Sequence, residues 1–102
     1  VYSACKGGVI SFSKTLAREV ARKQITVNVV CPGPTETALF RDFAGAGESG
    51  EKLRGALAKA IPFGRLAQPQ DVVGAVCFLS SDDAAFITGE VLSVSGGLTM
   101  AG

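Results

Sequence analysis

The sequence contains no histidine and only three cysteines among its 102 residues. The absence of histidine excludes the usual Ser-His-Asp arrangement of hydrolases and most zinc sites. Cys5, Cys31 and Cys77 lie far apart in apolar segments, without the spacing of metal ligands. We therefore interpret them as reduced, buried thiols, which are typical of a cytoplasmic protein.

Long apolar runs and a strong charge bias are also missing. No run approaches the roughly 20 residues of a membrane-spanning helix, and no charged segment followed by an apolar stretch marks a signal peptide. The net charge is only +1, so we expect neither nucleic acid nor a membrane as a partner. The chain starts without methionine inside a predicted helix, and we therefore expect it to be part of a longer protein.

The hydrophobic pattern predicts alternating helices and strands. The β-branched run over residues 25–31 is typical of a strand buried on both faces of a parallel sheet, with Asn28 as a hydrogen-bonded core residue. In chain order we expect a helix over residues 2–23, this strand, a short helix ending at Pro62, a helix beginning at Pro69 and a strand near residues 91–95. This alternation favours an α/β fold with a parallel sheet.

The helix predicted from Pro69 has a defined start and a predicted buried face. Proline suits the first turn of a helix, and the carboxylate of Asp71 suits its positive end. We expect the apolar stripe of this helix to be buried: Val72, Val73, Val76 and Leu79.

Residues 38–68 form the least regular part of the sequence, with a glycine-rich stretch over residues 45–51. Connections of this kind often form lids over binding sites, and an ordinary surface excursion is the alternative. Basic side chains occur in and near this segment: Arg41, Lys52, Arg54, Lys59 and Arg65. They would either contact the phosphates of coenzyme A or form a solvated helix face, and we favour the solvated face.

Tyr2 and Lys6 stand four residues apart at the start of the first predicted helix, so they share one helix face. A free tyrosine has a pKa of about 10, and a nearby cation favours its phenolate. Such a pair can exchange a proton with an alcohol or a ketone near neutral pH. An ordinary structural role on the helix surface is the alternative, and the pair alone does not decide between them.

The first predicted strand ends at the sequence Pro32-Gly33-Pro34. In open α/β sheets, ligands bind just beyond the carboxyl ends of the strands. We therefore expect residues 32–37 to lie where a cofactor would bind.

These elements together resemble the C-terminal half of the short-chain dehydrogenase/reductase family, over essentially all 102 residues. The resemblance is carried by Tyr2-x-x-x-Lys6 in a helix, a strand that ends in Pro-Gly, the Thr35-x-Thr37 loop and the sequence ITGEVLSVSGG. The spacing of the whole series is specific, whereas Y-x-x-x-K alone is weak. The resemblance implies the C-terminal half of a single Rossmann-type, doubly wound NAD(P)-binding domain, with residues 38–62 as a substrate-loop region.

The resemblance also implies roles for individual residues. Tyr2 would be the catalytic acid/base, and Lys6 would lower the pKa of Tyr2 and hydrogen-bond the nicotinamide ribose, so both would also bind the cofactor. Pro32 and Gly33 would flank the nicotinamide ring. In the loop that follows, the backbone of Thr35 would meet the carboxamide, and Thr37 would lie near the carboxamide or the pyrophosphate. No metal is implied.

Within the family, three stretches most resemble 2-hydroxycyclohexanecarboxyl-CoA dehydrogenases: CKGGVISFSKTLARE, ITVNVVCPGPTETAL and GEVLSVSGGLTM. The 3-oxoacyl-[acyl-carrier-protein] reductases are next, and they usually carry Asp or Asn where this chain has Ser95. We therefore expect an oxidoreductase that uses NAD and acts on a hydroxyacyl-CoA. A 3-oxoacyl reductase using NADPH is the alternative, and a non-catalytic binding or scaffold subunit is a third, against which Tyr2 and Lys6 argue.

Other family features are not found in these residues. The glycine-rich phosphate loop, the residue that selects NAD or NADP and the catalytic serine all precede the tyrosine in the family. We therefore expect the 102 residues by themselves to be poorly stable and inactive. The family commonly pairs the tyrosine-bearing helix with its twin, and Ala4, Gly7 and Gly8 would permit close approach, so we expect a homodimer or homotetramer.

Overall fold

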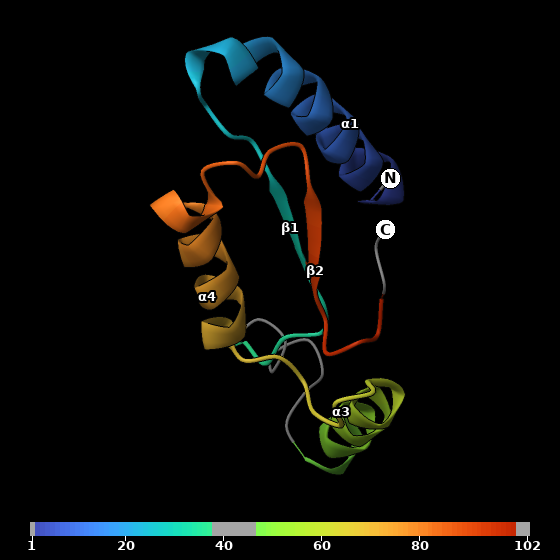
Figure 1. Ribbon diagram of the computed structural model, residues 1–102. Coiled ribbons are helices and arrows are strands. Elements are labelled where there is room, and N and C mark those ends of the chain that lie inside the picture. Colours follow the sequence, from blue (N-terminus) through green and yellow to red (C-terminus); the bar gives the residue numbers. More distant parts are fainter. Residues whose placement is uncertain (1, 38–46, 100–102) are drawn as a thin grey trace.

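The computed structural model describes residues 2–37 and 47–99, and within them it has an α/β architecture. In chain order the described elements are α1 (Tyr2–Val20), the 3-10 turn η1 (Ala21–Lys23), β1 (Val29–Pro32), α3 (Glu48–Ala60), α4 (Pro69–Leu79), the 3-10 turn η2 (Asp82–Ala84) and β2 (Val91–Val94). Figure 1 shows α1 and α4 on opposite sides of the two strands. The predicted order of helices and strands is confirmed.

β1 and β2 pair in parallel, with Val29 opposite Val91 and Pro32 opposite Val94. The register brings the carboxyl ends of both strands to the same edge. β1 is shorter and less buried than predicted, because its four residues are half-buried or exposed and residues 25–28 lie outside the strand. The prediction of a doubly buried strand over residues 25–31 was therefore wrong at its start.

Residues 27 and 28 are bonded to the turn before β2. The backbone N–H of Val27 donates to the hydroxyl of Thr88 at 3.0 Å. The side-chain amide of Asn28 donates to the carbonyl of Ile87 at 3.1 Å, and its oxygen accepts from the N–H of Glu90 at 3.1 Å. The predicted hydrogen-bonded asparagine is confirmed, and it sets the register in which β1 meets β2.

α4 begins at Pro69, as predicted, and its start is capped by side chains. The Asp71 carboxylate accepts from the backbone N–H of Gln68 at 2.7 Å and from Nη1 of Arg65 at 2.8 Å. These bonds, first that from Arg65 and then that from Gln68, lower the pKa of Asp71 to about 2 from 3.8. The carboxylate is therefore stabilised at the positive end of the helix.

The predicted buried stripe of α4 is only partly covered. Val72 and Leu79 are half-buried, whereas Val73 is 57% exposed and Val76 is 47% exposed. Cys77 is also exposed, which contradicts its interpretation as a buried thiol, and Cys31 is half-buried. The reason is geometric: the described sheet is too narrow to cover the whole inner face of the helix.

α3 ends at Ala60, and the residues after it are anchored to the end of β2. The helix begins at Glu48, inside the stretch expected to be irregular. Ile61 is buried, and a Cβ on Gly96 would lie 2.9 Å from its Cγ2. The N–H of Phe63 donates to the carbonyl of Gly96 at 3.1 Å. The Gly96-Gly97 break therefore makes the corner against which α3 ends.

The described chain buries little apolar surface. Its buried hydrophobic residues are few: Ala17, Ile61, Leu66 and Ala84. The accessible surface is 7424 Å², whereas a folded monomer of 10.4 kDa exposes about 5,400 Å². The radius of gyration is 16.1 Å, against about 13 Å for a compact domain of this length. This exposed surface supports the expectation that the segment is poorly stable alone.

We predict that residues 1–102 produced alone show no cooperative thermal transition and bind a hydrophobic dye strongly, because so much apolar surface is exposed. Circular dichroism melting and dye fluorescence check this, with the full-length protein as the control. A single sharp transition of the 102-residue chain would contradict it.

We predict that Asp71→Asn lowers the free energy of unfolding of the full-length protein at pH 7. The pKa of Asp71 is about 2 in the fold, so its contribution is fully present above about pH 5 and is lost as the pH falls from 4 to 2. The difference between the two proteins in urea unfolding should therefore shrink over that range. Glu19→Gln, which removes an exposed carboxylate from α1, should cause no such difference.

Candidate active site

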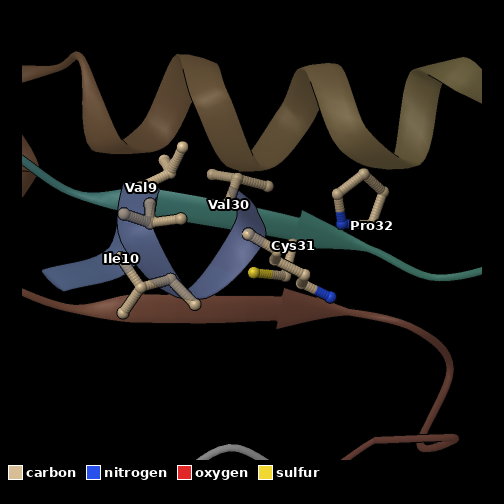
Figure 2. A pocket seen from close by; sticks show the side chains of 7 residues that line it. Val9, Ile10, Val30, Cys31 and Pro32 are labelled. Carbon is tan, nitrogen blue, oxygen red and sulfur yellow. The ribbon is translucent and has the colours of Figure 1, made fainter. Parts of the chain in front are cut away.

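An open groove lies between α1 and β1 and runs along the whole strand, from Val29 to Pro32. Its volume is about 370 Å³, and its walls are mostly apolar, with the single charged side chain of Lys6. It is lined by Lys6, Val9, Ile10, Val29, Val30, Cys31 and Pro32. Figure 2 shows Val9 and Ile10 reaching from α1 toward β1, and Pro32 where that strand ends. The fold therefore brings Lys6 and Pro32, predicted from separate motifs, to one groove.

Tyr2 lies on α1 one helical turn before Lys6. Its side chain lies outside the part that the structure describes, as do those of Ser3 and Cys5. The helical spacing of the two residues is confirmed, and the contact between the phenol and the ammonium remains a prediction.

Gly33 holds the end of β1 close to the end of β2. Its N–H donates to the carbonyl of Val94 at 2.9 Å, and its carbonyl accepts from the hydroxyl of Thr35 at 2.8 Å. A Cβ at Gly33 would lie 3.0 Å from both Cα and Cβ of Ser95. Glycine is therefore required here by the close approach of two backbones.

Beyond Gly33 the chain leaves β2 and pairs with residue 67. Thr35 forms a parallel bridge with Ala67. The N–H of Ala67 donates to the carbonyl of Pro34 at 2.9 Å, and the N–H of Glu36 donates to the carbonyl of Ala67 at 2.8 Å. We call residues 32–37 the cofactor loop. These bonds fix its backbone at the carboxyl edge of the sheet, where the sequence placed it.

Comparison with known proteins assigns the chain to a family. A family model described as enoyl-(acyl carrier protein) reductase matches residues 1–99. The 3-oxoacyl-[acyl-carrier-protein] reductase FabG of Escherichia coli (strain K12) is 52% identical over 99 residues, which are 97% of this chain and 38% of that protein. The chain belongs to the short-chain dehydrogenase/reductase family.

Other members agree with this assignment. FabG of Vibrio cholerae serotype O1 is 44% identical over 97% of this chain and 38% of its own length. The crystal structure of a short chain dehydrogenase family protein from Francisella tularensis subsp. tularensis SCHU S4 matches with a TM-score of 0.85 and 36% identity. That match covers 95% of this chain and 42% of the other. The resemblance and the Rossmann-type fold are confirmed, and the chain spans less than half the length of these relatives.

The described residues of this family member fit one end of a nicotinamide dinucleotide. Lys6 presents ammonium donors beside apolar walls that include Pro32, and these suit ribose hydroxyls and an apolar ring face. The same stretch holds no glycine-rich turn between a strand and a helix that would receive the phosphates. The described residues therefore suit the nicotinamide half of the dinucleotide and not its phosphates.

Two further findings concern the kind of site. Within residues 2–37 and 47–99, no group of three or more His, Cys, Asp or Glu side chains is placed to hold a metal ion. None of the helices described there has the length and apolar character to cross a membrane.

The sequence analysis missed an ion pair between the cofactor loop and α3. Nε of Arg54 donates to Oε1 of Glu36 at 3.2 Å. Arg54 had been considered only as a coenzyme A contact or a solvated residue. No spacing rule links positions 36 and 54, so only the acidic residue within Thr-Glu-Thr offered a signal.

The other basic side chains named in the sequence analysis have different surroundings. Arg65 pairs with Asp71 at 2.8 Å. Lys52 and Lys59 are exposed on α3, as the solvated interpretation expects, and Arg41 lies outside the described residues. Among the described basic residues, Arg54 and Arg65 are therefore engaged in ion pairs, and Lys52 and Lys59 are exposed.

Ser95 has a structural explanation. It is buried, and its hydroxyl lies 3.2 Å from the backbone N–H of Thr99, from its carbonyl and from its hydroxyl. The residue closes the turn after β2. Its identity is therefore explained by this turn without reference to a substrate.

We predict that Gly33→Ala destabilises the full-length protein by about 1–3 kcal/mol, because the added Cβ would meet the backbone of Ser95 at 3.0 Å. Urea unfolding measures the change. The matched control is Gly55→Ala on α3, where a Cβ meets nothing within 4 Å. That control should stabilise the protein by about 0.5–1 kcal/mol, and equal effects of the two changes would contradict the assignment.

Proposed function

We propose that residues 1–102 are the C-terminal part of one NAD(P)-binding domain and that the full-length protein is a 3-oxoacyl-[acyl-carrier-protein] reductase that uses NADPH. The observation that carries the proposal is the groove along β1 that Lys6 lines, in a chain 52% identical to FabG over 99 residues. Lys6 stands one helical turn after Tyr2 on α1. The match covers 38% of that relative, which supports the proposal that these residues are one part of a longer domain.

The chemistry assigned to this segment is proton transfer. The nicotinamide, when bound, supplies the hydride that reaches the substrate carbonyl carbon. The developing alkoxide then needs a proton, and we assign its donation to the phenolic hydroxyl of Tyr2. The ammonium of Lys6, one turn later, stabilises the phenolate that remains. This transfer needs no histidine.

An NAD-dependent dehydrogenase of a hydroxyacyl-CoA, such as 2-hydroxycyclohexanecarboxyl-CoA, is the second candidate. Three sequence stretches favoured it, together with Ser95 in place of Asp or Asn. The bonding of Ser95 to Thr99 weakens that argument, since it accounts for the serine by the turn alone. The names of the similar relatives favour the reductase.

The exposed face of α1 supports a homodimer or homotetramer. Val9 is 57% exposed and Phe12 is 67% exposed, and a Cβ at Gly7 or Gly8 would meet nothing within 4 Å. An apolar helix face with small residues suits close pairing with a second copy of the same helix. We place this assembly in the cytoplasm.

The test is an activity assay of the full-length protein in both reaction directions. Reduction is measured with NADPH or NADH and either acetoacetyl-acyl-carrier-protein or acetoacetyl-CoA. Oxidation is measured with NAD and 2-hydroxycyclohexanecarboxyl-CoA. We expect the highest kcat/KM with NADPH and the carrier-protein thioester. Preference for NAD and the alicyclic thioester would support the second candidate. Cofactor binding without turnover of any of them would support a non-catalytic subunit.

We predict that Tyr2→Phe lowers kcat by about 100- to 10,000-fold, because the proton donor is lost. The Kd for NADPH, measured by its fluorescence, should change less than about twofold, since Lys6 and the cofactor loop remain. Ser11→Ala, which removes an exposed hydroxyl from the same helix, is the matched control and should keep normal turnover. Near-normal turnover of Tyr2→Phe would remove Tyr2 from this role.

A further inference from the structure

We propose that Glu36 and Arg54 are positioning residues that hold α3 against the cofactor loop and couple cofactor binding to substrate binding. The proposal rests on the proposed function for the roles of the two segments. Neither side chain is assigned to the substrate, the cofactor or the reacting atoms.

α3 has few other means of support. Figure 1 shows it beyond the carboxyl ends of the strands, apart from α1 and α4. Gly50 is buried and Leu57 is half-buried, but Leu53 is 38% exposed, so this helix is only partly covered along its length. Its C-terminal end is held where Ile61 and Phe63 contact Gly96. A helix anchored at one end can still pivot unless a second contact restrains it.

The Glu36–Arg54 pair is that second contact. It lies about two turns before the C-terminal end of α3, and Nε of Arg54 is 3.2 Å from Oε1 of Glu36. The side chains are 27% and 17% exposed, respectively, so water screens the pair less than it screens a surface pair. The contact joins residues 18 apart in sequence. It is therefore a tertiary restraint on α3.

The backbone on the Glu36 side of the pair is itself fixed. The N–H of Glu36 donates to the carbonyl of Ala67 at 2.8 Å, and Thr35 is bridged to Ala67. Glu36 stands between Thr35, which the family resemblance assigns to the nicotinamide carboxamide, and Thr37, which it assigns to the carboxamide or the pyrophosphate. A change at the cofactor loop therefore reaches α3 through the carboxylate of Glu36.

α3 lies within the segment that the resemblance assigns to substrate binding. If cofactor in the loop favours one position of α3, then substrate held by α3 must favour cofactor to the same extent, since binding coupling is reciprocal. Loss of the ion pair should weaken this coupling and leave each separate binding site intact.

The experiment compares the full-length protein with Glu36→Gln, Arg54→Gln and the exchanged pair Glu36→Arg with Arg54→Glu. Each single variant should raise KM for the acetoacetyl thioester about three- to tenfold, with kcat and the Kd for NADPH within about twofold. The exchanged pair should recover most of the loss. Lys59→Gln, which removes an exposed cation from the same helix, is the matched control and should leave KM unchanged.

Hydrogen exchange gives a second readout that does not depend on the thioester. In the unaltered protein, NADPH should slow exchange of the amides of α3 (Glu48–Ala60) by about threefold or more, and Glu36→Gln should abolish that slowing. Slowing of equal size in both proteins, or none in the unaltered protein, would overturn the proposal.

The two proposals fail separately. If the unaltered protein reduces no thioester but the exchange result holds, the proposed function is wrong and the coupling stands. If the unaltered protein is active and the single variants keep its KM and its NADPH-dependent exchange, the coupling is wrong and the function stands.

Discussion

The parallel pairing of β1 with β2 is the constraint on which the rest of the described structure depends. It places Gly33 beside Ser95, so close that a Cβ at Gly33 would lie 3.0 Å from the Cα of Ser95. From this point the two segments diverge. The segment after β1 becomes the cofactor loop, and the segment after β2 turns at Gly96, where it contacts Ile61 and Phe63. Residues 32–37 and the attachment of α3 are thus built at the same edge of one sheet.

The two strands, the cofactor loop and the start of α4 are held by contacts from both side chains and backbone groups. Asn28 sets the register by bonding to residues 87 and 90, Ala67 bridges the cofactor loop, and Asp71 joins Arg65 to the start of α4. Such bonds need particular side chains at only a few positions. The remaining apolar faces, including Phe12 and Val73, are covered by nothing in the described residues, and they account for the large accessible surface.

Several features that depend on local sequence were predicted correctly, and several features that depend on tertiary contacts were not. The helices beginning near Tyr2 and Pro69 were predicted because each depends on local signals: periodicity and a capping carboxylate. The burial of Val73, Val76 and Cys77 was predicted wrongly because burial depends on what a helix packs against. The Glu36–Arg54 pair was missed for the same reason, since no local pattern links those positions.

The sequence by itself determined the family, the α/β order of elements and the placement of Tyr2 and Lys6 one helical turn apart, because these follow from spacing along the chain. Only the tertiary structure decided that Lys6 and Pro32 share a groove, that Ser95 bonds within a turn and that Glu36 pairs with Arg54 of α3. Each of these is a contact between segments whose approach is set by strand pairing and chain crossing, and sequence spacing carries no measure of that approach.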